Sequence, residues 1–156
     1  MSGTQFKLKL NDLQWSNWER DFEERLNNPE PFLKSMGEEM LPRIHKRFKD
    51  ERGPDGKAWA RLSPVTVAAR LKHNGNTPMT ILRNRGHLIG SINYQSSSSS
   101  LSIGSGNEVQ DYAAIHQFGG QAGRGRKVKI PARPYLGFAD EDMAVIEEEA
   151  ADYFME

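Results

Sequence analysis

Apolar side chains recur every three or four residues through most of the first third of this chain, and this spacing is typical of amphipathic helices. Two sets follow it: Trp15, Trp18, Phe22 and Leu26, then Leu33, Met36, Met40, Ile44 and Phe48. They predict one helix that Asp12 caps and that ends near Asn27–Pro29, and a second from Pro31 to about Glu51. Pro42 lies inside the second pattern, and because a proline in a helix interior costs roughly 3 kcal/mol, we expect a kink or a split there.

Alternating apolar residues predict short strands in other parts of the chain. The alternating sets are Phe6, Leu8 and Leu10; Ile92 with Tyr94; Leu101 with Ile103; and Val128 with Ile130. The middle two flank Ser96–Ser100 and predict a hairpin with a serine-rich tip. Pro131 and Pro134 interrupt the last strand, and we expect Tyr135 to Phe138 to resume strand pairing.

Turn and cap residues define the remaining elements. The sequence predicts a turn at Gly53–Gly56, a loop pinned to the core by Trp59 and Leu62, and a short helix that Ser63 caps and Pro64 opens. That helix is expected to run to about Lys72, with residues 73–76 closing it. Residues 82–91 are expected to form a turn or a short helix.

Two further helices follow. One starts after Asp111, carries Tyr112, Ala113, Ile115 and His116, and stops at Gly119-Gly120, where glycine permits positive φ. Asp140 is expected to cap a final helix, with one face formed by Met143, Ile146, Ala150 and Tyr153 or Phe154.

These elements predict an α+β fold in which a small antiparallel β-sheet packs with helices. A length of 156 residues with 37% hydrophobic residues suits one domain, 1–156, with a helical part at about 12–52 and a sheet-containing part at about 53–156. The net charge is zero, but residues 1–133 carry +8 and residues 134–156 carry −8. Segments of opposite charge can pair head to tail between copies.

Several classes of function find no support. The chain has no cysteine, which excludes disulfides, thiolate nucleophiles and Cys-ligated metals. It shows no apolar run suited to a signal peptide or a membrane span, so we expect a product made in the cytoplasm and no membrane partner. The four histidines lack metal-ligand spacing, and we expect no metal, no cofactor and no enzymatic activity. His116 is the best candidate for a catalytic base, but a polar anchor donating to a backbone carbonyl is favoured over it.

The segment 124–133 concentrates positive charge. Its cations are Arg124, Arg126, Lys127, Lys129 and Arg133, and glycines 119, 120, 123 and 125 lie among or before them. Nucleic acid is one possible partner. No aromatic side chain that could stack on bases lies among these cations, and the whole chain is neutral, so we favour an acidic protein surface or the acidic end of a neighbouring copy.

The chain from about Phe48 to Asp142 resembles the phage virion morphogenesis family, the tail-completion proteins of Mu-like and related contractile-tailed phages and prophages. The resemblance depends on the order and spacing of several motifs. They are Pro54-Asp55-Gly56 with Trp59, Leu62-Ser63 and Thr66; Leu82, Gly86, Leu88 and Ser91-Ile92; then Tyr112-Ala113, His116-Gln117-Phe118-Gly119-Gly120 and Pro131-Ala132-Arg133-Pro134-Tyr135-Leu136-Gly137.

The resemblance implies a structural phage protein of the virion tail or neck, made in the host bacterial cytoplasm. It implies a tail-terminator-like fold, a hexameric ring at the end of the tail tube, and contacts with tube, sheath and head–tail connector proteins. A tail terminator and a head–tail joining factor both remain open. We expect the 119–134 loop to contact an adjacent copy or the tail tube. The alternatives are a small DNA-binding or packaging-associated protein that uses segment 124–133, and a hydrolase with His116 in its site.

Overall fold

The computed structural model describes residues 12–74 and 79–155. The strand expected at Phe6 to Leu10 lies outside these residues, and so does the side chain of Asp12, the expected cap of the first helix.

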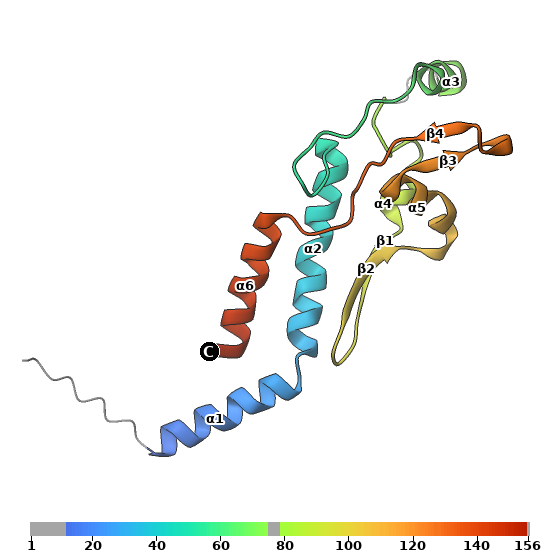
Figure 1. The fold of residues 1–156 in the computed structure, drawn as a ribbon. Coiled ribbons are helices and arrows are strands. Elements are labelled where there is room, and N and C mark those ends of the chain that lie inside the picture. Colours follow the sequence, from blue (N-terminus) through green and yellow to red (C-terminus); the bar gives the residue numbers. More distant parts are fainter. Residues whose placement is uncertain (1–11, 75–78, 156) are drawn as a thin grey trace, which may run out of the picture.

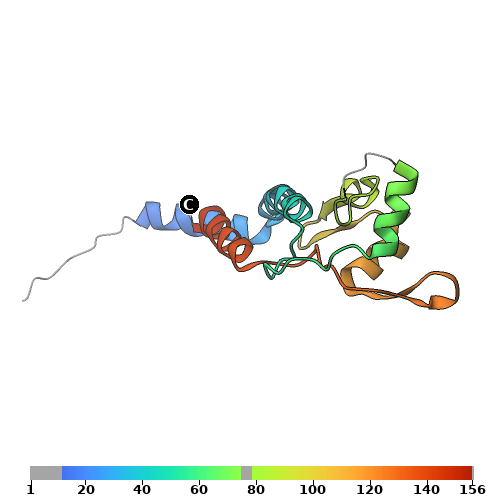
Figure 2. The same cartoon turned by 90° about the horizontal axis from the view of Figure 1, so that it is seen from above.

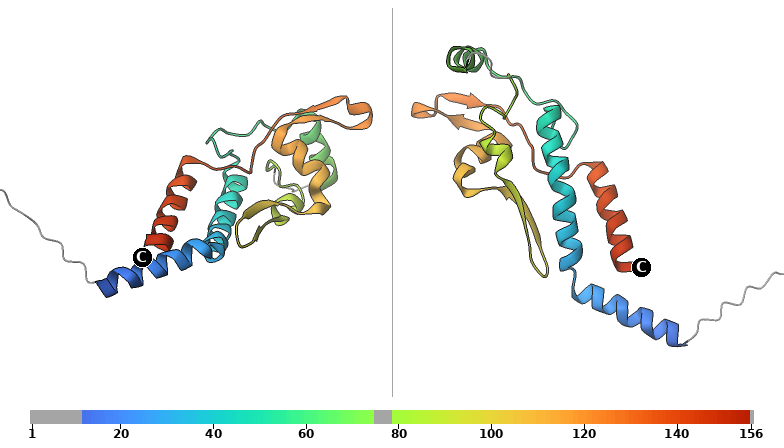
Figure 3. Two further views of the ribbon diagram at one scale, coloured as in Figure 1. Left: turned by 60° about the horizontal axis from the view of Figure 1, so that its bottom comes forward. Right: turned by 180° about the vertical axis from the view of Figure 1, so that it is seen from behind.

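Three long helices form one side of the molecule. They are α1 (Asp12–Asn27), α2 (Glu30–Asp50) and α6 (Asp140–Met155). α6 runs alongside α2, while α1 continues away from the lower end of the pair (Figures 1 and 3). The boundaries predicted for the first two helices are confirmed.

Pro42 does not split α2, which is one helix of 21 residues. The side chain of Pro42 is exposed, and so is Glu38, the residue four positions earlier whose carbonyl loses its helical partner. That carbonyl is therefore on the solvent side, while Met36, Met40, Ile44 and Phe48 are buried on the opposite side. Burial of this apolar face offsets the cost of the proline.

The other side of the molecule consists of short elements (Figure 2). They are α3 (Pro64–Asn74), α4 (His87–Gly90), β1 (Ile92–Ser96), β2 (Leu101–Ser105), η1 (Asn107–Val109), α5 (Gln110–Phe118), β3 (Gly120–Ala122), η2 (Arg124–Arg126) and β4 (Val128–Ile130). The strands form two separate antiparallel pairs, β1 with β2 and β3 with β4. The α+β class, with small antiparallel sheets packed on helices, is confirmed, although the strands do not share one sheet.

The expected strand at Tyr135 to Phe138 is wrong. The backbone N–H groups of Tyr135 and Leu136 both donate to Oε1 of Gln117, at 3.0 Å each. The side-chain amide of Gln117 also donates to the carbonyl of Leu136 at 3.0 Å. One glutamine of α5 therefore satisfies the backbone groups that a neighbouring strand would otherwise pair with.

Three details near helix ends also differ from prediction. α3 continues to Asn74, two residues beyond the expected Lys72. α6 begins at Asp140, but the acceptor at its start is Asp142, whose Oδ2 takes a hydrogen bond of 2.7 Å from the Ala139 N–H. Because Asp142 is buried, the helix is turned so that Met143 is 43% exposed and not on the packed face.

The core lies where α2 meets the short elements. Its members are Ile44, Phe48, Trp59, Ile81, Leu88, Ile92, Val109, Ala113 and Tyr135. Phe48 contacts the rings of Trp59 and Tyr135, with centroids 5.4 and 5.2 Å away. Gly37 of α2 lies directly against the ring of Tyr94, so a Cβ there would overlap the ring. The core thus holds β1 and the 131–139 segment on one face of α2.

A buried ionic cluster joins α6 to α2. The Arg47 guanidinium donates to the Asp142 carboxylate, to the Tyr135 carbonyl at 3.0 Å and to the Gly137 carbonyl at 2.8 Å. Arg43 adds a second cation 3.6 Å from Asp142. Both members of the central pair are buried, and their remaining polar groups are satisfied by backbone, which is the condition under which a buried ion pair is tolerated.

Candidate functional site

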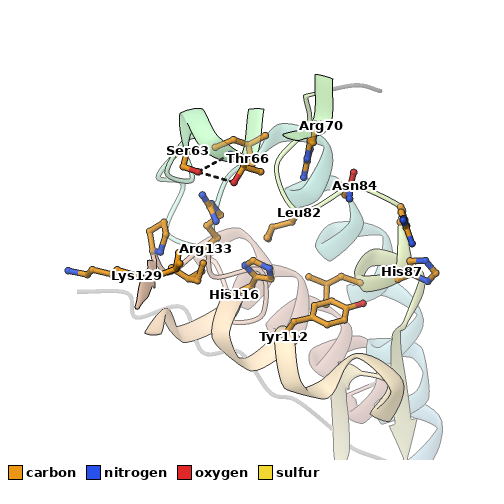
Figure 4. A pocket seen from close by; sticks show the side chains of 17 residues that line it. Ser63, Thr66, Arg70, Leu82, Asn84, His87, Tyr112, His116, Lys129 and Arg133 are labelled. Carbon is orange, nitrogen blue, oxygen red and sulfur yellow. Dashed lines mark hydrogen bonds between the residues drawn. The ribbon is translucent and has the colours of Figure 1, made fainter. Parts of the chain in front are cut away.

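A hollow of about 530 Å³ opens between α3, α4, α5 and β4 (Figure 4). Its lining mixes apolar and basic side chains: Leu62, Ser63, Thr66, Arg70, Leu82, Asn84, Arg85, Gly86, His87, Leu88, Tyr112, His116, Val128, Lys129, Ile130, Pro131 and Arg133. Four of these residues are cations, and none of the described lining residues is acidic. We call this hollow the basic pocket. It is suited to a ligand surface that is both apolar and negatively charged.

Two of the four cations belong to the framework of the pocket. Arg133 is buried; its Nε donates to the Ala60 carbonyl at 2.8 Å and a terminal nitrogen donates to the Arg61 carbonyl at 3.0 Å. Arg70 donates to the Thr80 carbonyl at 2.7 Å. Burial lowers the pKa of Arg133, and the nearby positive charge of Arg70 lowers it further. The structure thus separates Arg133 from the exposed cations with which the sequence interpretation grouped it.

The other two cations, Arg85 and Lys129, are exposed at the edge of the pocket. Neither forms an ion pair with any of the residues that the structure describes. Their charges are therefore available to a partner. Sequence reasoning missed Arg70 and Arg85, although the close pair Arg83 and Arg85 before Gly86 is a signal that could have drawn attention to this loop.

His116 lies in the wall of the pocket (Figure 4). Its Nδ1 is buried without a hydrogen-bond partner, so the expectation that its imidazole donates to a backbone carbonyl is wrong. Burial lowers the pKa of His116, and the positive charge of Arg133 lowers it further. The ring of Tyr112 meets it edge to face, with centroids 6.4 Å apart.

Two hydroxyl groups that line the pocket, those of Ser63 and Thr66, lie at the start of α3. Ser63 Oγ accepts the Thr66 N–H at 3.2 Å and lies 2.9 Å from the Thr66 hydroxyl, which confirms Ser63 as the cap of α3. Within residues 12–74 and 79–155, no hydroxyl or carboxylate is hydrogen-bonded to His116, and no group of three or more His, Asp and Glu residues could hold a metal. The described residues thus place no nucleophile in hydrogen-bond contact with His116.

Most of the cationic segment 124–133 lies in a projecting hairpin. β3 and β4 pair over three residues each, with η2 at the tip, and the hairpin extends from the body of the molecule (Figures 1 and 2). Arg124, Lys127 and Lys129 are exposed on it. Arg126 lies at the tip, and its side chain is outside what the structure describes. We call residues 120–130 the basic hairpin; through Val128, Lys129 and Ile130 it also forms one wall of the basic pocket.

The residues of the motifs singled out in the sequence lie at three kinds of position: in the core, at the end of α5 and on the surface. Trp59 is buried and donates to the Pro134 carbonyl at 2.8 Å, which ties the 131–139 segment to the core. Gly119 ends α5 with φ +74, and Gly120 also has a positive φ, as predicted. The surface positions are Tyr112, Phe118 and Pro131, with Phe118 79% exposed at the base of the basic hairpin.

A second exposed surface is aromatic. Trp15, Trp18 and Phe22 form a row of rings along α1: Trp15 is tilted against Trp18, with centroids 5.3 Å apart, and Trp18 stacks on Phe22 at 5.2 Å. Trp15 and Trp18 are 50% and 40% exposed. The spacing predicted this amphipathic helix correctly. The last turn of α1 is held to α6, where Arg25 donates to the Tyr153 carbonyl and the Tyr153 hydroxyl donates to the Asn28 carbonyl. We call the side of α1 that carries Trp15, Trp18 and Phe22 the aromatic face.

The sequence matches one family of proteins over almost its whole length. The model of the phage virion morphogenesis family matches residues 10–155. The chain belongs to this family. It is similar to Mu-like prophage FluMu G protein 2 of Haemophilus influenzae, with 36% identity over 124 residues that cover 80% of this chain and 77% of that protein. No solved structure matches.

The family thus connects this chain with the building of a phage particle, as the motifs around His116 and Pro131 predicted. In the described part of the chain, no helix combines the length and the apolar content that crossing a lipid bilayer requires.

Proposed function

We propose that this protein is a non-enzymatic tail-completion factor, which assembles as a ring at the end of the phage tail tube and there terminates the tube or prepares it for the head. The observation that carries the proposal is the basic pocket with its adjoining hairpin, where Arg85, Arg124, Lys127 and Lys129 form no ion pair with the described residues, on a chain whose net charge is zero. Because the whole chain is neutral, this local basic surface is suited to an acidic protein partner more than to a long polyanion such as nucleic acid.

The distribution of acidic residues supports contact between copies. The exposed side of α6 carries Glu141, Glu147, Glu148 and Asp152, on a segment that contains no base. Two oppositely charged, non-equivalent surfaces on one chain produce head-to-tail contacts, and a head-to-tail contact closes into a ring when its rotation permits.

Electron microscopy of phage particles made without this protein distinguishes the two roles. Tubes longer than normal indicate a terminator, and tubes of normal length without heads indicate a joining factor. Complete particles in its absence would contradict both.

The basic hairpin can be tested by charge reversal. Changing Arg124, Arg126, Lys127 and Lys129 to Glu is expected to alter tail length or head attachment, because it reverses the charge that the partner meets. Reversal of Lys49 and Lys72, which are exposed outside the hairpin, serves as the control and should leave particles normal. Normal particles from the hairpin variant would contradict a role for the hairpin.

A DNA-binding role for segment 124–133 is the second candidate, because Arg124, Lys127 and Lys129 are exposed together on the hairpin. It requires affinity for DNA of arbitrary sequence that falls steeply as salt increases. The hairpin variant should then lose this binding, and the wild-type protein should show no such binding if the tail-completion role is correct.

A further inference from the structure

We propose that the aromatic face of α1 docks into the basic pocket of a second copy of this chain. The inference deepens the proposed function and rests on it, since it names the contact that would join neighbouring subunits in a ring.

The first argument is that, within residues 12–74 and 79–155, nothing buries the rings of the aromatic face. Trp15 and Trp18 are 50% and 40% exposed, and their tilted rings present apolar surface to solvent. Large exposed aromatic surfaces of this kind mark contact sites in soluble proteins, and tryptophan is enriched among the residues that contribute most to interfaces.

The second argument is complementarity of charge. α1 contains five acidic and two basic residues, for a net charge of −3. Glu19 and Glu23 follow Trp15 at intervals of four residues, so they lie along the edge of the aromatic face. The basic pocket offers the opposite combination, with Leu62, Leu82 and Ile130 for the rings and the exposed Arg85 and Lys129 for the carboxylates.

A second hollow provides the contrast. The space of about 1170 Å³ between α2 and the start of α6 is lined by residues of both signs, among them Glu39, Arg43, Lys46, Asp50 and Glu141. Several of these residues already pair with one another, as Arg43 does with Glu39 and Lys46 with Asp50. Its charges are balanced within the subunit, whereas those of Arg85 and Lys129 are not.

The third argument is position. Helix α1 lies at the opposite end of the molecule from α3, α4, α5 and β4, the elements that surround the basic pocket (Figures 1 and 2). α1 therefore cannot reach the pocket of its own chain, and the contact must be made between copies. A donor surface at one end and a receiving surface at the other give a head-to-tail series, which is the type of contact that forms closed rings.

Charge reversal in two variants tests the contact. Variant A carries Glu19→Arg and Glu23→Arg, and variant B carries Arg85→Glu and Lys129→Glu. We expect each variant alone to self-associate at least tenfold more weakly than the wild-type full chain, as measured by sedimentation equilibrium. An equimolar mixture should recover association, because the basic α1 of A meets the acidic pocket of B, and the acidic α1 of B meets the basic pocket of A.

Matched controls keep the test specific. Glu24→Arg reverses an acidic charge on the side of α1 opposite Trp15 and should leave association unchanged. Glu147→Arg with Glu148→Arg tests the acidic side of α6 as the occupant. The proposal is wrong if this α6 variant loses association while variant A keeps it, or if the mixture of A and B associates no better than either variant. A wild-type chain that stays monomeric at high concentration would also overturn it.

Tryptophan fluorescence gives a second measurement that needs no variant. Two of the three tryptophans, Trp15 and Trp18, lie on the aromatic face, and Trp59 is buried in the core. Dilution of the associated wild-type chain should shift its emission to the red as Trp15 and Trp18 become exposed, and association without any shift would contradict the docking. Failure of these tests would contradict the docking alone. The tail-completion role is tested separately, on particles made without the protein.

Discussion

Gly119 holds a backbone conformation, φ +74 and ψ 176, that side chains with a Cβ rarely adopt. A Cβ there would also lie 2.9 Å from the Ala132 nitrogen and 3.1 Å from the Ile130 carbonyl oxygen. We predict that Gly119→Ala lowers the free energy of unfolding by about 2–3 kcal/mol, from backbone strain and the displaced segment together. Urea unfolding measures this, with Gly90→Ala as the control, since a Cβ at Gly90 meets nothing within 4 Å. Equal losses in the two variants would contradict the explanation.

His116 adds a dependence of stability on pH. Its folded-state pKa is lowered below the ordinary 6.5 because burial and Arg133 both disfavour the charged ring. Protonation is therefore easier in the unfolded chain, and the stability that is present above pH 6.5 should be lost as pH falls below 6.5 toward the folded-state pKa. Chemical unfolding between pH 5 and 7.5 checks this. His116→Gln should flatten the dependence, whereas His87→Gln, at an exposed position, should leave it as it is.

At the scale of elements, Pro42 is a source of instability that α2 tolerates. Pro42→Ala should restore the hydrogen bond to the Glu38 carbonyl and remove the clash of the ring with that turn, and we predict a gain of about 1–2 kcal/mol after allowing for the greater freedom of the unfolded chain. Thermal unfolding measures the gain. Lys49→Ala, another exposed change to alanine in α2, is the control. A Pro42→Ala variant no more stable than wild type would show that the helix is already relaxed around the proline.

Periodicity and cap residues were sufficient to predict most elements, because their causes are local. The spacing of Trp15 to Leu26, the Ser63-Pro64 start of α3 and the glycines after α5 each act within a few residues. The strand expected at Tyr135 to Phe138 failed for a long-range reason, since its N–H groups are taken by Gln117 of α5. Likewise, the run of five cations indicated the basic hairpin, but only the fold brings Arg70 and Arg85 beside it and removes Arg133 to the interior.

At the scale of the whole molecule, the buried Arg47–Asp142 pair joins α2 to α6. Asp142→Asn would leave the buried Arg47 charge without its carboxylate, and removal of one partner of a buried pair typically costs about 3–5 kcal/mol. We predict a loss of stability in this range by urea unfolding. The control is Asp50→Asn, which removes one member of the exposed pair with Lys46 and should change stability far less. A small loss in Asp142→Asn would indicate that solvent reaches Arg47.

The placement of the aromatic face and the basic pocket at opposite ends has a genetic consequence under the proposed docking. A copy in which Trp15, Trp18 and Phe22 are changed to alanine still presents an intact pocket, so it can join a series of subunits but cannot extend it. Each such copy would hold the normal copies already joined to it in a series that cannot close into a ring. Co-expression of this variant with the normal gene during infection should therefore reduce the yield of phage out of proportion to its share of the protein, whereas a variant damaged at both ends should be harmless.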